Sequence, residues 1–235
     1  TKKNLSQVEE VFRCIDEHFQ KYPELRKVLK FVGSISGRTQ MLAEAYIKEW
    51  EVKHGLKAPE YIIKFYQREA KRGCAGGGCY AYSHAAFSQY GLNGLAFNQT
   101  WAGEKIVKSL ASDVRDKWHP VNCGTVKAAF DHEVGHKIDE LLKLSTDKDF
   151  LTIFNEAKAK GATYIQDNLS RYSYNPKNGR TSYGNYTAEK EFIAEAWSEY
   201  LNNEPPRPIA AAVGMLILKK YKAMKKSQSS KSSST

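Results

Sequence analysis

The chain has 235 residues, 41% hydrophobic and 26% charged, with a formal net charge of +10 at pH 7. This length suits one domain or two small ones around a sizeable core, and the composition is that of an ordinary globular protein. The longest apolar run, IAAAVGMLIL at 209–218, has half of the roughly 20 residues that span a bilayer, so we expect no membrane span.

The basic charge is spread along the chain, with a mild concentration in KKYKAMKK at 219–226. Because no nucleic-acid-binding motif accompanies it, we interpret it as a solvated surface and expect no nucleic-acid partner. Four cysteines, Cys14, Cys74, Cys79 and Cys123, are too few and too scattered for a disulfide framework. Cys74 and Cys79 flank AGGG, a spacing that would also suit a bridged loop or a metal knuckle, but with no second pair nearby we expect free thiols.

Helices are predicted throughout the first third of the chain. Apolar residues recur at helical spacing over 4–31, 39–54 and 58–72. The sequence SGR at 36–38 is expected to separate the first two of these helices.

The composition changes at Gly73. Residues 79–98 are rich in aromatic, small and glycine residues, which predicts a short β-meander with turns at Gly91 and at Asn93-Gly94. We therefore divide the chain into an N-terminal helical region at 1–72, packed on a main domain at 73–225, and a low-complexity, disordered tail at 226–235.

The remainder of the chain again favours helices, and residues 161–187 are expected to form a loop. The predicted helices cover 104–118, 125–144, 148–160, 188–202 and 209–225. The fold class expected from these elements is α+β, mostly helical with a small mixed β-sheet beside the helix predicted over 125–144.

The helix predicted over 125–144 contains the sequence HEVGH. On a helix, His132 and His136 lie one turn apart on the same face, a spacing at which two imidazoles hold one zinc ion. Glu133, next to His132, can take a proton from a metal-bound water. A chance match to this pattern is expected only about 0.01 times in a chain with six histidines. We therefore favour a metal site over a helix with unrelated histidines.

A catalytic zinc needs a third protein ligand, and no histidine follows His136. The sequence AEKEFIAEAWSEY offers Glu191, Glu195 and Glu199, spaced four apart on one helical face. In such a row one carboxylate can bind the metal while the next accepts the free N–H of a ligand histidine. Spacing alone leaves two pairs open: Glu191 with Glu195, or Glu195 with Glu199.

These blocks resemble a known family. HEVGHKID, FLTIFNEAKAKG, SYG at 182–184 and EFIAEAW at 191–197 are similar to the catalytic domain of anthrax lethal factor-like zinc peptidases, which include the Pro-Pro endopeptidases. The resemblance implies a zincin-like fold in which Glu191 is the third zinc ligand, Glu195 supports the site and Tyr183 stabilises the oxyanion. Because this chain has one extra residue between the SYG tyrosine and the glutamate, Tyr186 is the alternative donor.

A second resemblance spans more of the chain. GLAFN at 94–98, the Trp118–Pro120 turn, the HExxH helix and RPIA…VG at 207–214 are similar to zincin-type domains found with phage minor head proteins. This implies two alternatives to a free-standing peptidase: a virion structural protein that retains the domain, with other virion proteins as partners, or a toxin-type protease effector. The location implied is the virion or host cytoplasm for a phage protein, and secretion otherwise.

We therefore expect a zinc-dependent endopeptidase that binds a protein or peptide substrate and one Zn²⁺ through His132, His136 and Glu191, with Glu133 as the base. Tyr183 is expected to donate to the oxyanion. Leu95, Ala96 and Phe97 are expected to bind substrate, because GLAFN would form an edge strand to which a peptide adds. Two further histidines are expected to be structural: His84 and His119.

Overall fold

A computed structural model of the chain describes residues 5–74, 80–98, 103–174 and 187–232. Most of these residues lie in helices, and three short strands form one small mixed sheet, which confirms the α+β class. The chain divides into two compact units, Thr1–Leu25 with Gly103–Thr235, and Arg26–Ala102. This division differs from the boundary predicted at 72/73, because the helices predicted over 39–54 and 58–72 belong to the same unit as the sheet.

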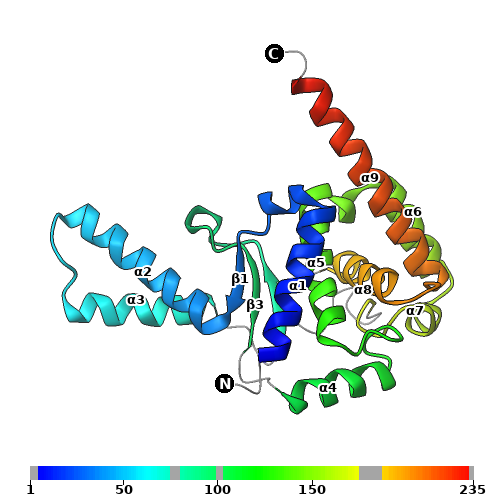
Figure 1. Ribbon diagram of the computed structural model, residues 1–235, viewed down its shortest axis with the longest axis horizontal. Coiled ribbons are helices and arrows are strands. Elements are labelled where there is room, and N and C mark those ends of the chain that lie inside the picture. Colours follow the sequence, from blue (N-terminus) through cyan, green and yellow to red (C-terminus); the bar gives the residue numbers. More distant parts are fainter. Residues whose placement is uncertain (1–4, 75–79, 99–102, 175–186, 233–235) are drawn as a thin grey trace. The chain divides into compact units, whose positions relative to one another are not determined.

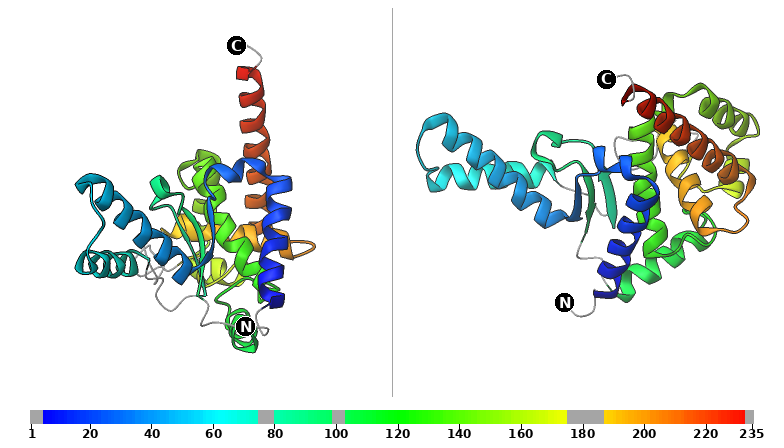
Figure 2. Two further views of the ribbon diagram at one scale, coloured as in Figure 1. Left: turned by 60° about the vertical axis from the view of Figure 1, so that its left-hand side comes forward. Right: turned by 45° about the horizontal axis from the view of Figure 1, so that its top comes forward.

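The first unit is helical. Its helices are α1 (Leu5–Lys21), α4 (Glu104–Arg115), α5 (Val126–Leu142), α6 (Lys148–Ala159), α7 (Ala162–Asn168), α8 (Ala188–Asn202) and α9 (Pro208–Ser232). Helices α5 and α8 lie against each other in the middle of this unit, with α1 and α9 beside them (Figures 1 and 2).

Apolar residues on nearly every side of α5 and α8 explain why both helices are buried. Phe130 of α5 and Phe192, Ile193 and Trp197 of α8 have no exposed surface. Aromatic contacts tie α8 to α6, because the Phe192 ring packs edge-on against Phe154 at 5.1 Å between centroids. The two helices that carry the predicted ligands therefore form the core of the unit.

The ends of α5 are set by local chemistry. Thr125 is the N-cap, and its side chain accepts a hydrogen bond from the backbone N–H of Ala128 at 3.0 Å. Lys143 ends the helix in the left-handed conformation at φ 55°. The bounds predicted for α8, 188–202, are those observed.

Helix α9 extends further than expected. The tail predicted to be disordered from residue 226 continues the helix to Ser232, with hydroxyls of Ser227 and Ser229 donating to the carbonyls of Met224 and Lys226. This stretch contains neither glycine nor proline to stop the helix. None of the helices in the part of the chain that the structure describes is long and apolar enough to cross a membrane.

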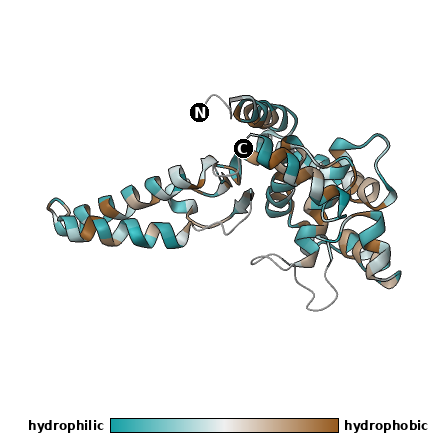
Figure 3. Ribbon diagram, turned by 90° about the horizontal axis from the view of Figure 1, so that it is seen from below, coloured by the Kyte–Doolittle hydropathy of each residue, from teal (hydrophilic) through white to brown (hydrophobic). Residues whose placement is uncertain are grey.

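The second unit combines a helical hairpin with the sheet. Its elements are β1 (Phe31–Ser34), α2 (Ile35–His54), α3 (Glu60–Gly73), β2 (Ala81–His84) and β3 (Gly94–Phe97). Helices α2 and α3 run side by side (Figures 1 and 3). Several large apolar side chains of this hairpin are exposed: Met41, Val52, Leu56, Tyr61 and Phe65.

Two expectations for the second unit are wrong. The helix predicted over 4–31 ends at Lys21, and Phe31 begins a strand instead. The sequence at 36–38 does not break a helix but forms the first turn of α2, because the Ser34 side chain accepts from the N–H of Gly37 at 3.0 Å and caps that helix.

Strand β3 was expected at the edge of the sheet, and this is also wrong. The strand order is β1-β3-β2, so β3 pairs with β1 in parallel and with β2 in antiparallel register. The backbone of β3 is hydrogen-bonded to a neighbouring strand on each side, and Leu95 and Ala96 are fully buried. An extended peptide therefore cannot add to β3 as a further strand, which removes the reason for assigning substrate binding to Leu95, Ala96 and Phe97.

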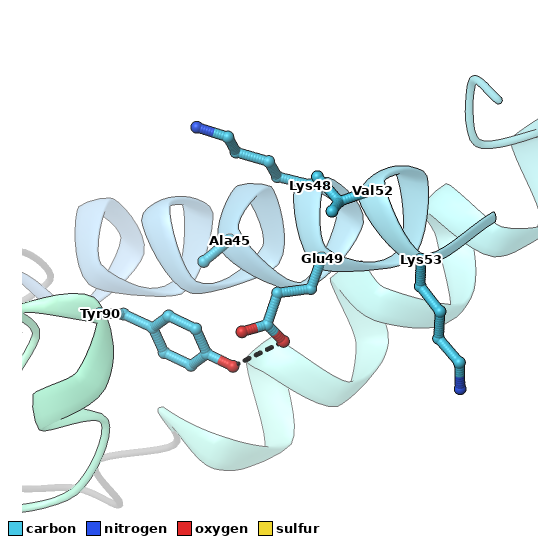
Figure 4. A pocket seen from close by; sticks show the side chains of 6 residues that line it. All are labelled: Ala45, Lys48, Glu49, Val52, Lys53 and Tyr90. Carbon is cyan, nitrogen blue, oxygen red and sulfur yellow. Dashed lines mark hydrogen bonds between the residues drawn. The ribbon is translucent and has the colours of Figure 1, made fainter. Parts of the chain in front are cut away.

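A hollow of about 370 Å³ lies along α2 (Figure 4). At its side the Tyr90 hydroxyl donates to the Glu49 carboxylate at 2.9 Å. The residues that line it, which are Ala45, Lys48, Glu49, Val52, Lys53 and Tyr90, include no histidine or cysteine. The hollow therefore offers no set of metal ligands among the described residues.

Candidate metal centre

Helix α5 presents the two histidines of the HExxH sequence on one face, as their spacing predicts. The imidazoles of His132 and His136 lie 5.0 Å apart between centroids, with their planes at 87°. Both are nearly buried, with 8% and 6% of the residue exposed. Glu133 follows His132 on the same helix and is also buried, with 7% exposed. These three polar residues therefore lie together inside the helical unit.

Helix α8 places Glu191 opposite this pair. One oxygen of Glu191, Oε2, lies 3.3 Å from His132 Nε2 and 3.6 Å from His136 Nε2. Ligand atoms bound tetrahedrally at about 2.05 Å from a zinc ion are themselves about 3.3 Å apart. His132, His136 and Glu191 are thus spaced as ligands around a common point, and they could hold a metal ion.

Glu195, one turn further along α8, contacts the other nitrogen of His132. Its Oε1 lies 2.7 Å from His132 Nδ1, which is closer than two ligands on one metal, although the angles of this contact are not those of a hydrogen bond. An ionised carboxylate has no proton to donate, so this contact favours the tautomer of His132 with its proton on Nδ1, with Nε2 facing Glu191.

The third glutamate of the row has another role. Glu199 accepts hydrogen bonds from the Arg207 guanidinium through both of its oxygens, at 2.8 and 2.7 Å. Arg207 also donates to the backbone carbonyls of Asp167 and Leu169. Glu199 is therefore committed to a structural ion pair, and of the two pairs left open by the spacing, Glu191 with Glu195 is the one that reaches the histidines.

The centre pairs ionised carboxylates with imidazoles. Burial alone would raise the pKa of the Glu191 carboxyl, but the His136 and His132 imidazoles lower it to about 2. Burial acts in the same way on Glu195, where His119 and His132 lower the pKa to about 2. Both carboxylates are ionised at neutral pH and, although burial opposes this, they raise the pKa of the His132 imidazole well above its usual value. A cation bound between His132 and Glu191 would therefore displace a proton from this imidazole.

One histidine of the site was missed by sequence reasoning. His119, expected to be structural, lies beside His132 with 6.0 Å between ring centroids, and its Nδ1 lies 2.9 Å from Glu195 Oε1. Its side chain is 26% exposed. The Trp118–Pro120 turn gave the only signal, and nothing in its spacing linked His119 to the HExxH sequence, which begins 13 residues later.

Backbone contacts hold His119 in this position. The N–H of Arg171 donates to the carbonyl of Lys117 at 2.7 Å, and the N–H of Tyr172 donates to the carbonyl of Trp118 at 3.3 Å. The Tyr172 ring then lies 5.8 Å from the His119 ring and 5.9 Å from the His132 ring. Two loops distant in sequence thus enclose one side of the metal centre.

Other predicted site residues lie elsewhere. Tyr183, Tyr186 and Cys79 are outside the described residues. Leu95, Ala96 and Phe97 belong to the second unit. The three described cysteines, Cys14, Cys74 and Cys123, are free and buried, in agreement with the prediction of unpaired thiols.

Comparisons of the chain with protein-family models, with curated proteins and with solved structures found no match. The interpretation of the site therefore depends on its own geometry.

Proposed function

We propose that the protein is a zinc-dependent endopeptidase with a zincin-like catalytic unit. The observation that supports this most directly is that His132, His136 and one oxygen of Glu191 converge at ligand spacing beside Glu133. This is the donor set of a site with three protein ligands and one open position, which is the arrangement of catalytic and not structural zinc.

Each residue has a separate task in this proposal. Bound zinc supplies Lewis-acid activation of the scissile carbonyl and of the attacking water. Glu133 takes the proton from that water and delivers it to the leaving amine. Glu195 holds the proton of His132 on Nδ1, so that Nε2 stays available to the metal. The oxyanion donor is proposed to be Tyr183, with Tyr186 as the alternative.

The first measurement is zinc content. The purified chain should contain close to one zinc per molecule, and His132→Ala or His136→Ala should lose it. His54→Ala is the matched control, because His54 is exposed and its Nδ1 contacts the carbonyl of Trp50 in its own helix. Zinc content that is the same in all three variants would contradict the proposal.

The second measurement separates catalysis from metal binding. Glu133→Gln should keep zinc and the fold but lose cleavage of a peptide library, because the base is replaced by an amide of the same shape. A wild-type chain that holds zinc and cuts no peptide would instead support the alternative, a virion protein in which the domain survives as an interaction module.

A further inference from the structure

We infer that His119 is a positioning residue of the metal centre, which holds the Glu195 carboxylate and through it the orientation of His132. This inference rests on the proposed zinc site and adds a residue that neither the HExxH sequence nor the glutamate row contains. Its basis is the position of Glu195 between two imidazoles from different parts of the chain.

The two imidazole contacts of Glu195 share one oxygen. Oε1 lies 2.9 Å from His119 Nδ1 and 2.7 Å from His132 Nδ1. Because the carboxylate can only accept, His119 donates to it from Nδ1, whereas His132 Nδ1 approaches the same oxygen without the angles of a hydrogen bond. His119 therefore fixes the position of Glu195 Oε1, the oxygen that His132 Nδ1 also contacts.

The position of the Glu195 carboxylate depends on these two imidazoles. Its side chain has no exposed surface, and its other oxygen, Oε2, has no hydrogen-bond partner among the residues that the structure describes. Without His119, one imidazole contact would be left to hold a flexible, buried carboxylate. The orientation of His132, and with it the direction of Nε2 towards Glu191, would be less well defined.

His119 is itself fixed before any metal binds. Its loop is paired with Arg171–Tyr172 through backbone hydrogen bonds, its own N–H approaches the carbonyl of Asp113 at 3.3 Å, and Pro120 follows it directly. The Tyr172 ring packs against it. A donor held in this way loses little conformational freedom on bonding to Glu195.

A second metal bound by His119, His132 and Glu195 would be a different role for the same residues. The distances oppose it, because 2.7 and 2.9 Å are hydrogen-bond lengths, whereas two atoms on one zinc lie about 3.3 Å apart. His132 would also have to bind one metal through each ring nitrogen. A zinc stoichiometry near one supports the positioning role, and a stoichiometry of two that falls to one in His119→Leu would overturn it.

The test compares two variants of His119 in the full chain. His119→Asn keeps an N–H donor close to the position of Nδ1, whereas His119→Leu removes it. The dissociation constant for zinc, measured by competition with a chromophoric chelator, should rise about 10- to 100-fold in His119→Leu and by much less in His119→Asn. The visible spectrum of the cobalt-substituted protein should change in the leucine variant and be largely restored in the asparagine variant.

Thermal unfolding of the metal-free variants provides the structural control. If His119→Leu does not fold, His119→Gln replaces it, because its amide lies further from Glu195 while remaining polar. Equal zinc affinity in wild type and His119→Leu, or an asparagine variant as weak as the leucine variant, would overturn the inference alone. A wild-type chain that binds no zinc would overturn the proposed function and this role together.

Discussion

Each ring nitrogen of His132 contacts a different glutamate, and these two glutamates lie one turn apart on α8. Nε2 faces Glu191 at 3.3 Å, and Nδ1 contacts Glu195 at 2.7 Å. The two carboxylates are similar in burial and in pKa, and they differ in the nitrogens that they meet: Glu191 faces Nε2 of His132 and His136, whereas Glu195 contacts Nδ1 of His132 and His119. In the proposed zinc site, that difference separates a metal ligand from a residue that orients one.

This separation can be measured. Glu191→Ala removes a ligand and should cost more zinc affinity than Glu195→Ala, for which we expect a loss of about 10- to 100-fold. Titration of each metal-free variant with zinc in the presence of a competing chelator gives both constants. If Glu195→Ala lost the metal while Glu191→Ala kept it, the roles of the two glutamates would be reversed.

Sequence reasoning placed residues on a common helical face correctly where their partners lie on the same helix. His132, Glu133 and His136 are related by a spacing of one turn, and so are Glu191 and Glu195. It failed for His119, because the contact with Glu195 joins positions 76 residues apart. The spacing also could not distinguish between the two glutamate pairs, because the residue that pairs with Glu199 is Arg207, which does not lie on α8.

At the scale of elements, Gly135 sets how closely α5 and α8 approach. A Cβ added at this position would lie 2.7 Å from the Cα of Ala194, which is closer than real side chains come to a backbone. Gly135 directly precedes His136 on α5, and Ala194 directly precedes Glu195 on α8. The glycine therefore permits the contact that brings the carboxylates to the histidines.

Because of this close contact, we expect the Gly135→Ala substitution to lower the stability of the protein and not to raise it. Glycine to alanine inside a helix ordinarily stabilises by up to about 1 kcal/mol. Gly135→Ala should instead destabilise the protein by about 1–3 kcal/mol, because α8 must move away from α5, and it should weaken zinc binding because Glu191 moves with that helix. Urea unfolding and zinc titration measure the two effects.

Gly37→Ala is the control for this prediction. Gly37 lies in the first turn of α2, and an added Cβ there would meet only the Ser34 hydroxyl at 3.1 Å. This variant should leave zinc affinity unchanged. A Gly135→Ala variant with wild-type stability and wild-type zinc affinity would show that the two helices can separate at no cost to the site.

The elements themselves were predictable to different degrees. Helix α8 was predicted at its observed bounds, because its apolar pattern and the proline-rich EPPRP after it are local signals. Strand β1 was missed, since its parallel pairing joins Phe31 to Gly94, far along the chain, and leaves no local pattern in four residues. The same non-local pairing places β3 in the centre of the sheet.

For the whole molecule, the proposed zinc would link two helices that are distant in sequence. His136 lies on α5 and Glu191 on α8, 55 residues later. A ligand that binds only the folded chain stabilises it by about 2.7 kcal/mol when its free concentration is about 100 times the dissociation constant. For a protein of this size that corresponds to a rise in unfolding temperature of roughly 5–10 °C.

Calorimetry of the zinc-loaded protein, before and after removal of the metal by a chelator, checks this expectation. Glu191→Ala is the matched control, because its unfolding temperature should respond far less to zinc at the same concentration. An equal response in the wild type and in Glu191→Ala would show that zinc acts at some other place on the chain.

The division of the chain into units has a consequence for synthesis on the ribosome. Helix α1 belongs with α5, since His18 packs edge-on against Phe130 at 5.6 Å, but the whole of Arg26–Ala102 is made between them. Roughly 120 residues separate the ends of α1 and α5, which takes about 6–24 s at about 5–20 residues per second. During that time the second unit is synthesised completely and can fold. The face of α1 that carries Cys14, Ile15 and His18 is buried in the folded protein, but it has no partner until α5 has been synthesised. The nascent chain thus exposes an amphipathic segment until α5 emerges, and this is the interval in which a chaperone would meet it.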